Sequence, residues 1–223
     1  MERALKIVSH PLLVSYEEGL AQQLSIVDRL LKDPTAPYEL HFLEHRSVLT
    51  LGRCFEQQHL VLNRAELAKR SVDVLEVSRG GSVTYHGPGQ LVIYLHVHLK
   101  EISCYLTHYL RDLEQWVIDV LQDLKIDAGR REGLTGVWTS KGKICAMGVA
   151  AKKFVTYHGL GLNFSVDLDC FRWIVPCGLT EPVATLQQWP EFKLKRSELE
   201  AVFLRHLPLW LASRERWEAT KDI

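Results

Sequence analysis

A glycine-rich stretch directly before an apolar run is the feature that most constrains this chain. Residues 79–90 read RGGSVTYHGPGQ and hold four of the chain's fourteen glycines. Glycine has no Cβ and reaches positive φ at low cost, so this stretch can bring backbone close to a ligand. The apolar run 91–95 that follows has the composition of a β-strand. Turn chemistry explains the glycines and Pro88 but not the polar residues between them, so the stretch is predicted to be a binding loop on a rigid strand.

The rest of the chain alternates strand-like runs with helical periods. Apolar residues at helical spacing predict helices over 15–32 and 103–124, a short helix at 64–69 and a terminal helix at 197–207. In the terminal helix, Ser197 and Glu200 have the spacing of a capping box, and Pro208 is expected to end it. Strands are predicted at 38–44, 47–51, 72–77, 91–99 and 155–166, with a hairpin joining 136–139 to 143–150.

The order of these elements predicts the fold class. The strands follow one another closely in the sequence, so much of their pairing is expected to be antiparallel. A chain of 223 residues with 47% hydrophobic content is long enough to bury a sizeable core. We expect an α+β protein with a mixed, largely antiparallel sheet flanked by helices, forming one domain over residues 1–223.

Charge and composition disfavour several classes of partner. The net charge is zero and the pI is about 7.1, so no overall field favours nucleic acid or a membrane surface. No apolar segment approaches the roughly 18 residues of a membrane span, and the N-terminus lacks the apolar core of a signal peptide. Five cysteines without a CxxC pair indicate reduced thiols and argue against a zinc site. A cytoplasmic protein without nucleic-acid or membrane partners is expected.

Two residues carry the strongest signals for chemistry. Cys177 stands between Pro176 and Gly178, a context that predicts an accessible turn rather than a core strand. Lys143 opens a predicted strand, and beside a cysteine its charge would lower the pKa of the thiol, while its neutral amine would serve as a base. The remaining cysteines are expected to be buried and inert, as free thiols usually are: Cys54, Cys104, Cys145 and Cys170.

Four histidines have weaker signals. His86 and His158 each precede a glycine, and each is either a proton shuttle or a hydrogen-bonding wall residue, the second being favoured for a lone histidine. His96 and His98 share one face of a predicted strand. No third ligand lies nearby in the sequence, so no metal site is expected there.

Four segments in the same order resemble the octanoyltransferases of lipoate biosynthesis. They are residues 79–90, Lys143-Ile144 followed by Gly148, residues 157–163 (YHGLGLN) and residues 176–179 (PCGL). Each segment alone is weak evidence for the family, but four segments in the family's order are specific for it. The chain departs from the family where Leu95 follows Tyr94, a position at which members often have proline, and in the run His96-Val97-His98.

The resemblance implies a fold, a reaction and partners. The fold would be that of biotin and lipoate protein ligases. The reaction would transfer an octanoyl group from octanoyl-acyl carrier protein to a lysine of a lipoyl domain, through a thioester on a cysteine and without a cofactor, as the first step of endogenous protein lipoylation. The acceptors would be the lipoyl domains of 2-oxoacid dehydrogenase complexes and the glycine cleavage H protein.

The resemblance also implies roles for residues. Cys177 matches the nucleophile that forms the thioester, and Lys143 matches the lysine that lowers the pKa of its thiol. The positions that match substrate contacts are Arg79, Gly80, Gly81, Ser82, Val83, Thr84, Tyr85, His86, Ala146, Met147, Gly148, Gly159, Leu160 and Gly161.

Two other functions remain open at this point. An ATP-dependent lipoate or biotin-type protein ligase of the same fold adenylates a free acid and needs no cysteine nucleophile. Its substrate loop would use the same Arg79-Gly80-Gly81 segment, so only Cys177 together with Lys143 favours the transferase. A non-catalytic binding module for acyl chains or carrier proteins is the third possibility, which the same two residues disfavour.

Overall fold

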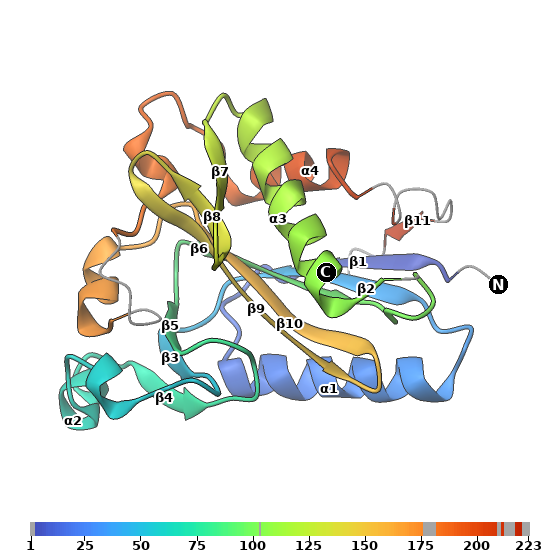
Figure 1. The fold of residues 1–223 in the computed structure, drawn as a ribbon, viewed down its shortest axis with the longest axis horizontal. Helices are drawn as coiled ribbons and strands as arrows, with labels where there is room; N and C mark the ends of the chain where they lie inside the picture. Colours follow the sequence, from blue (N-terminus) through green and yellow to red (C-terminus); the bar gives the residue numbers. More distant parts are fainter. Residues whose placement is uncertain (1–2, 103, 176–181, 209–210, 212–216, 220–223) are drawn as a thin grey trace.

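The computed structural model describes residues 3–102, 104–175, 182–208, 211 and 217–219. Its larger sheet has eight strands in the order β11-β1-β2-β6-β10-β9-β8-β7 (Figure 1). β1 pairs in parallel with β2 and β11, and the other pairs are antiparallel. In sheet order the strands are β11 (Trp217–Ala219), β1 (Leu5–Ser9), β2 (Tyr38–Leu43), β6 (Gln90–His96), β10 (Val155–Asn163), β9 (Gly142–Lys152), β8 (Leu134–Thr139) and β7 (Ala128–Arg131).

A second sheet of three strands lies beside the first and carries its own hydrophobic cluster. Its order is β4 (Asp73–Glu76), β3 (Val48–Leu51) and β5 (Val83–His86), with β3 parallel to β4 and antiparallel to β5. Figure 1 shows this sheet and α2 (Arg64–Ala68) together at one end of the molecule. The 3-10 helices are η1 (Gln57–His59), η2 (Leu168–Trp173) and η4 (Leu186–Gln188). The single domain over residues 1–223 stays a prediction.

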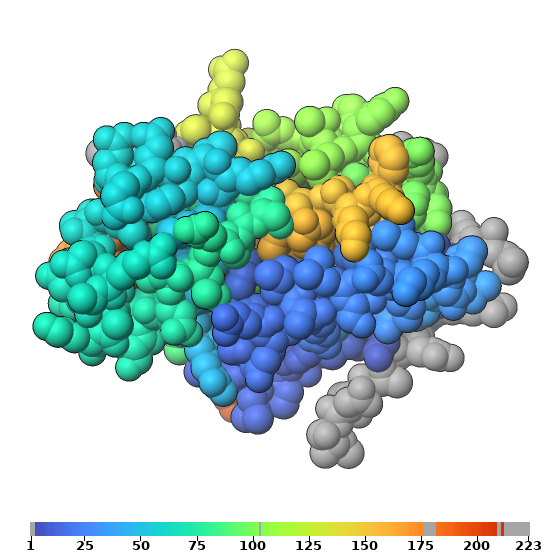
Figure 2. All heavy atoms as spheres, turned by 90° about the horizontal axis from the view of Figure 1, so that it is seen from below, coloured from blue at the N-terminus to red at the C-terminus, as the bar shows by residue number. Residues whose placement is uncertain are grey.

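Helices cover both faces of the larger sheet. α1 (Tyr16–Lys32) lies on one face, and α3 (Leu106–Asp123) and α4 (Arg196–Arg205) lie on the other (Figure 1). Figure 2 views the molecule from the α1 side, with this blue helix next to the teal small-sheet region. β2 and β6 are buried along their whole length because they have a layer on each face. The predicted α+β class with a mixed, mostly antiparallel sheet is therefore confirmed.

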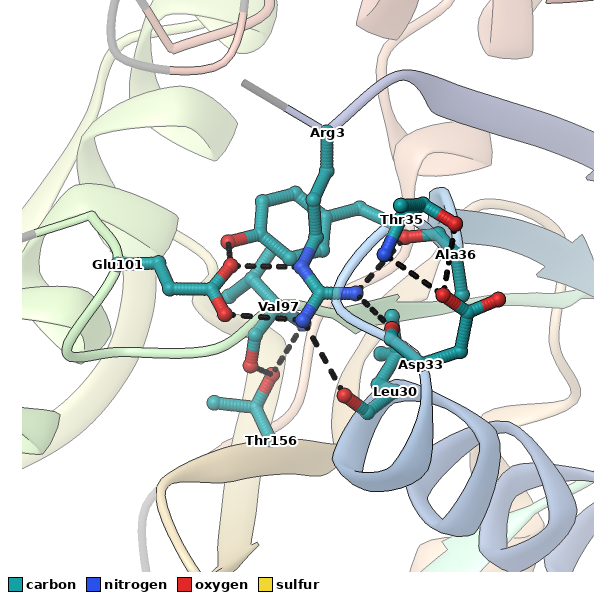
Figure 3. A network of polar contacts seen from close by, with 9 residues as sticks. Arg3, Leu30, Asp33, Thr35, Ala36, Val97, Glu101 and Thr156 are labelled. Atoms are coloured by element: carbon teal, nitrogen blue, oxygen red, sulfur yellow. Dashed lines mark hydrogen bonds and ion pairs between the residues drawn. The ribbon is translucent and has the colours of Figure 1, made fainter. Parts of the chain in front are cut away.

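Arg3 joins the end of α1 to the loop after β6. Its guanidinium donates to both carboxylate oxygens of Glu101, at 2.6 and 2.9 Å, and to the carbonyl oxygens of Leu30, Asp33 and Ala36 (Figure 3). These acceptors include carbonyls that a helix end leaves without intrahelical partners. A single side chain thus closes the C-terminal end of α1.

The sequence patterns predicted the helices correctly, but one predicted helix cap is wrong. The predicted helix over 15–32 forms with Ser15 as its N-cap, in a capping box with Glu18. The Ser197–Glu200 capping box is wrong, because α4 already begins at Arg196. The N–H of Lys195 donates to Glu198, and Glu200 instead accepts from Arg196 at 2.7 Å.

Other predicted boundaries shift by a few residues. The strand predicted over 91–99 ends at His96, after which His98 makes only an isolated bridge to Val155. The helix predicted over 103–124 is Leu106–Asp123. The short strands β1, β7 and β11 were not predicted, and β5 forms inside the glycine-rich stretch. In the described part of the chain, no helix is long and apolar enough to span a membrane.

Candidate functional site

A cavity of about 70 Å³ lies where the glycine-rich stretch meets β9 and β10. Segments far apart in the sequence form its wall. The predicted site residues that line it are Arg79, Gly80, Gly81, Val83, Thr84, His86, Lys143, Ala146, Met147, Gly148, Gly159, Leu160 and Gly161. The structure therefore brings nearly all of the predicted residues to one place, while their individual roles stay predictions.

Ser82 and Tyr85 are not among the residues that line the cavity. Ser82 Oγ is hydrogen-bonded to His59 Nδ1 at 2.8 Å, and Tyr85 packs in the small sheet's hydrophobic cluster with its hydroxyl on Ser47. Tyr85 lies between Thr84 and His86 on a strand, so its side chain points to the opposite face. Cys177 lies outside the described residues.

Residues that sequence reasoning did not assign to substrate complete the wall. They are Tyr16, Val92, Tyr94, His158, Asn163, Phe171 and Val183. The sequence favours a wall position for His158, and Asn163 is the last residue of the segment 157–163 that resembles the family. Tyr16 had no local signal, because it starts α1 and reaches the cavity only through packing. Its hydroxyl lies 3.2 Å from Nδ1 of His158.

Arg79 is buried and bonded to the small sheet. Nη2 donates to the carbonyl oxygen and the hydroxyl of Thr50 at 2.6 and 2.8 Å, and Nε donates to the same hydroxyl at 3.1 Å. Nη1 donates to the carbonyl of Gly80. The side chain is 6% exposed. Arg79 therefore fixes the start of the glycine-rich stretch against β3 as well as lining the cavity.

A break in the pairing of β8 with β9 sets the direction of the Lys143 side chain. The register between β8 and β9 shifts between Val137 and Trp138, which pair with Cys145 and Lys143. Ile144 is thus one extra residue of β9 opposite the step from Val137 to Trp138, which makes a β-bulge. Bulges of this kind change the direction of side chains beside active sites.

The side chain of Lys143 is confined from two sides. Its Nζ lies 4.9 Å from the centroid of the Trp138 ring, within the range of a cation–π interaction. Gly136 has φ 134° and its missing side chain leaves the space that the lysine uses, since a Cβ there would lie 2.7 Å from Cε of Lys143. Gly136 is in turn anchored through its N–H to the buried carboxylate of Glu114 at 3.0 Å.

The backbone of Lys143 binds the segment that follows Cys177 in the sequence. Its N–H donates to the carbonyl of Pro182 at 2.8 Å, and its carbonyl accepts from the N–H of Ala184 at 2.9 Å. Val183 between them forms a parallel bridge with Lys143. Val183, six residues after Cys177 in the sequence, lines the cavity.

The histidines around the cavity are neutral at physiological pH. Burial, with smaller effects of His45 and Arg79, lowers the pKa of His86 to about 3. Burial also lowers the pKa of His45 and of His158 to about 4. The same desolvation raises the pKa of Tyr16 to about 12. The cavity therefore offers neutral hydrogen-bonding groups on this side.

The described cysteines differ in accessibility. Cys145 and Cys170 are buried and Cys104 is half-buried, but Cys54 is exposed, so the expectation of burial is wrong for Cys54. Burial raises the pKa of the Cys145 thiol despite the nearby Lys143, which makes it a poor nucleophile. Within the described residues, no group of three or more His, Cys, Asp or Glu side chains is arranged to hold a metal ion.

Comparison with solved structures identifies the fold. The chain superposes on a bipartite lipoate protein ligase from Thermoplasma acidophilum, determined with its E2 lipoyl domain, with a TM-score of 0.69 and 17% identity, covering 100% of this chain and 88% of the other. It matches a lipoate-protein ligase A bound with ATP at a TM-score of 0.69 and 16% identity, over 100% and 90% of the chains. A biotin protein ligase from Aquifex aeolicus matches at 0.52 and 12% identity, over 95% and 68%. The predicted biotin and lipoate ligase fold is confirmed.

Comparison of sequences identifies the family. Residues 15–208 match the model of the lipoyl protein ligase A/B catalytic domain. An octanoyltransferase of Solibacter usitatus is 44% identical over 74% of this chain and 77% of its own length. An octanoyltransferase of Gloeobacter violaceus is 42% identical over 84% and 82%. The chain therefore belongs to the lipoyl protein ligase A/B catalytic domain family and, within it, to the octanoyltransferases, which are acyltransferases.

Proposed function

We propose that this chain moves an octanoyl group from octanoyl-acyl carrier protein to a lysine of a lipoyl domain through a thioester on Cys177. The observation that carries the proposal is the position of Lys143. Lys143 lines the cavity, and its backbone is paired with Pro182 and Ala184, just after Cys177 in the sequence. An amine held in this way is suited to activate a nearby thiol.

The chemistry proceeds in two half-reactions. The thiolate of Cys177 attacks the thioester carbonyl of the donor, a C–S bond forms and another breaks, and the carrier's thiol leaves with a proton. Because one thioester replaces another, this exchange needs no ATP. Lys143 takes the proton from the Cys177 thiol in the first half-reaction.

In the second half-reaction, the amine of the target lysine attacks the octanoyl-cysteine carbonyl. A C–N bond forms, the C–S bond breaks, Lys143 takes one proton from the attacking nitrogen, and the Cys177 sulfur regains a proton. In this scheme, backbone N–H groups of the glycine segments stabilise the oxyanion, and losing one such donor typically costs about 3 kcal/mol. Formation of the amide drives the step forward.

The walls of the cavity suit an alkyl chain. Val92, Met147 and Leu160 line it beside the glycines of β9 and β10. Burial of an alkyl chain stabilises it by roughly 0.8 kcal/mol for each methylene. The apolar wall favours an alkyl group over a short polar one, with only modest discrimination between neighbouring chain lengths.

The partners follow from the family. The proposed acceptors are the lipoyl domains of 2-oxoacid dehydrogenase complexes and the glycine cleavage H protein, and the proposed donor is octanoyl-acyl carrier protein. One protein of the same fold was determined with an E2 lipoyl domain, which supports a lipoyl domain as acceptor. Action in the cytoplasm without a cofactor completes the proposal.

The decisive experiment is mass spectrometry of the protein after incubation with octanoyl-acyl carrier protein. An octanoyl adduct is expected on Cys177 and is expected to disappear when an apo lipoyl domain is added. Cys177→Ser should abolish transfer to the lipoyl domain, while Cys54→Ser, which alters the exposed thiol, should keep the activity. Full transfer by Cys177→Ser would refute the covalent scheme.

A second measurement separates the transferase from its ATP-dependent alternative. The transferase is expected to modify the lipoyl domain with octanoyl-acyl carrier protein alone, in the absence of nucleotide. A strict requirement for ATP and free octanoate would instead identify a ligase. Lys143→Ala is expected to raise the pKa of the Cys177 thiol in an alkylation profile.

A further inference from the structure

A continuous line of hydrogen bonds connects His86 to the backbone of Lys143. His86 Nδ1 lies 2.6 Å from Gln90 Oε1, and Gln90 Nε2 donates to Asn163 Oδ1 at 2.9 Å. Asn163 Nδ2 donates to the carbonyl of Ala184 at 3.0 Å, and the N–H of Ala184 donates to the carbonyl of Lys143. The line crosses β5, β6, β10 and the segment after Cys177 and ends at β9, so it joins several of the segments that line the cavity.

The line fixes which nitrogen of His86 carries the proton. The carbonyl of Ala184 only accepts, so the nearby atom of Asn163 must be its NH₂ group. The oxygen of Asn163 then faces the NH₂ group of Gln90, which also donates to the carbonyl of Tyr85 at 3.2 Å. The oxygen of Gln90 is therefore the atom that faces His86, and it requires an N–H at Nδ1.

The second ring nitrogen of His86 is consequently an acceptor. His86 is neutral, because burial lowers its pKa far below physiological pH. In a neutral imidazole with a proton on Nδ1, Nε2 carries a lone pair. Nε2 has no hydrogen-bond partner among the described residues, and His86 lines the cavity. The neighbouring aromatic rings, Tyr16 at 6.0 Å and His45 at 5.8 Å between centroids, hold the ring in place.

We infer that His86 binds the incoming lysine of the acceptor protein, with Nε2 accepting a hydrogen bond from the attacking amine. This rests on the proposed function and adds a residue to its second half-reaction. The neutral amine has two N–H groups. One donates to His86 Nε2, which aims the nitrogen lone pair at the acyl carbon, and the other is the proton that Lys143 removes. His86 neither gains nor loses a proton in this cycle.

If His86 binds the attacking amine, its variants should slow only the second half-reaction. Acylation of Cys177 involves no amine, so it is expected to proceed at the normal rate in a His86 variant. Transfer from octanoyl-Cys177 to an apo lipoyl domain is expected to slow by about tenfold to a hundredfold in His86→Phe, which keeps a ring but removes the acceptor. His86→Gln, which places an amide oxygen near the position of Nε2, is expected to recover part of the rate.

The experiment measures the two half-reactions separately. Each protein is acylated with octanoyl-acyl carrier protein, the adduct is quantified by mass spectrometry, and its loss is followed after apo lipoyl domain is added. Gln90→Met, which breaks the line at its centre, should slow the same step to a smaller extent. His108→Gln, which alters an exposed histidine of α3, is the matched control and should leave both rates unchanged.

Two outcomes would overturn the inference. Equal rates of transfer for the wild type and His86→Phe would remove His86 from amine binding. A ¹⁵N–¹H NMR spectrum of the wild-type protein is expected to show the proton of His86 on Nδ1, and a proton on Nε2 would refute the inference without any variant. If the wild type forms no octanoyl adduct at all, it is the proposed function that fails, not the role of His86 alone.

Discussion

Nη2 of Arg79 lies 2.6 Å from the carbonyl oxygen of Thr50 and 2.8 Å from its hydroxyl oxygen. Arg79 begins the glycine-rich stretch, and Thr50 lies in the middle of β3 in the small sheet. Both side chains are almost fully buried. The position of the cavity wall therefore depends on a polar contact between two segments that are 29 residues apart, rather than on the loop itself.

Replacing Arg79 tests this dependence. Arg79→Met removes a buried guanidinium and leaves the Thr50 oxygens without their donors, so the free energy of unfolding is expected to fall by about 2 kcal/mol. Arg79→Lys is expected to rescue little, because an ammonium lacks the planar fork that reaches both oxygens. Urea unfolding measures both variants. Arg53→Met, at an exposed arginine, should change the stability by less than about 0.5 kcal/mol, and an equal loss there would contradict the assignment.

A substitution of Gly52 tests how tightly the glycine-rich stretch packs against the end of β3. A Cβ at Gly52 would lie 2.7 Å from Nη1 of Arg79 and 2.9 Å from the carbonyl oxygen of Ser82. Gly52→Ala is therefore expected to destabilise the protein by about 1–3 kcal/mol and to slow acylation of Cys177, because the loop must move. Gly129→Ala, where a Cβ would meet nothing within 4 Å, serves as the control. Thermal unfolding and adduct formation, measured side by side, decide whether the two glycines differ.

Substitutions of Trp138 test whether its contact with the Lys143 side chain affects the reactivity of Cys177. Trp138→Leu removes the ring face that lies against the ammonium group, whereas Trp138→Phe keeps one. An interaction of about 1 kcal/mol corresponds to roughly a fivefold change. We therefore expect alkylation of the Cys177 thiol at neutral pH to slow about fivefold in the leucine variant and much less in the phenylalanine variant. Identical alkylation profiles for the two variants would show that the ring face does not matter.

Acid should destabilise the fold through its buried histidines. Burial lowers the pKa of His45 to about 4 and of His86 to about 3, below the value of about 6.5 expected in the unfolded chain. The folded state therefore binds fewer protons than the unfolded state. The stabilisation is complete above about pH 6.5 and is lost as the pH falls toward 4 for His45 and toward 3 for His86. At pH 5 each such histidine costs up to about 2 kcal/mol relative to pH 7.

Urea unfolding at pH 7, 6 and 5 measures this effect, and the free energy of unfolding is expected to fall at each step. Proton NMR provides an independent check, since the ring signals of His45 and His86 should not titrate between pH 8 and 5. Their titration near pH 6.5, or a stability that does not change down to pH 5, would contradict the burial of neutral histidines.

The candidate site illustrates what local pattern can and cannot predict. Arg79, Lys143 and Gly148 were recognised because they stand in segments with distinctive residues at fixed spacing, and the structure brings them to one cavity. Tyr16 was missed because a tyrosine at the start of an amphipathic helix has no local mark of function. Ser82 was grouped with its neighbours although its hydroxyl bonds to His59, a contact that a loop sequence does not encode.

The sequence by itself determined the helices, the α+β class and the family. Helical spacing and the Ser15 cap act between residues that are three or four positions apart, so their energetics are local and readable. Only the tertiary structure decided the strand order, the bulge that aims Lys143 and the line of bonds that fixes the proton of His86. These features arise from contacts between distant segments, which remove side chains from water and thereby set both their geometry and their charge.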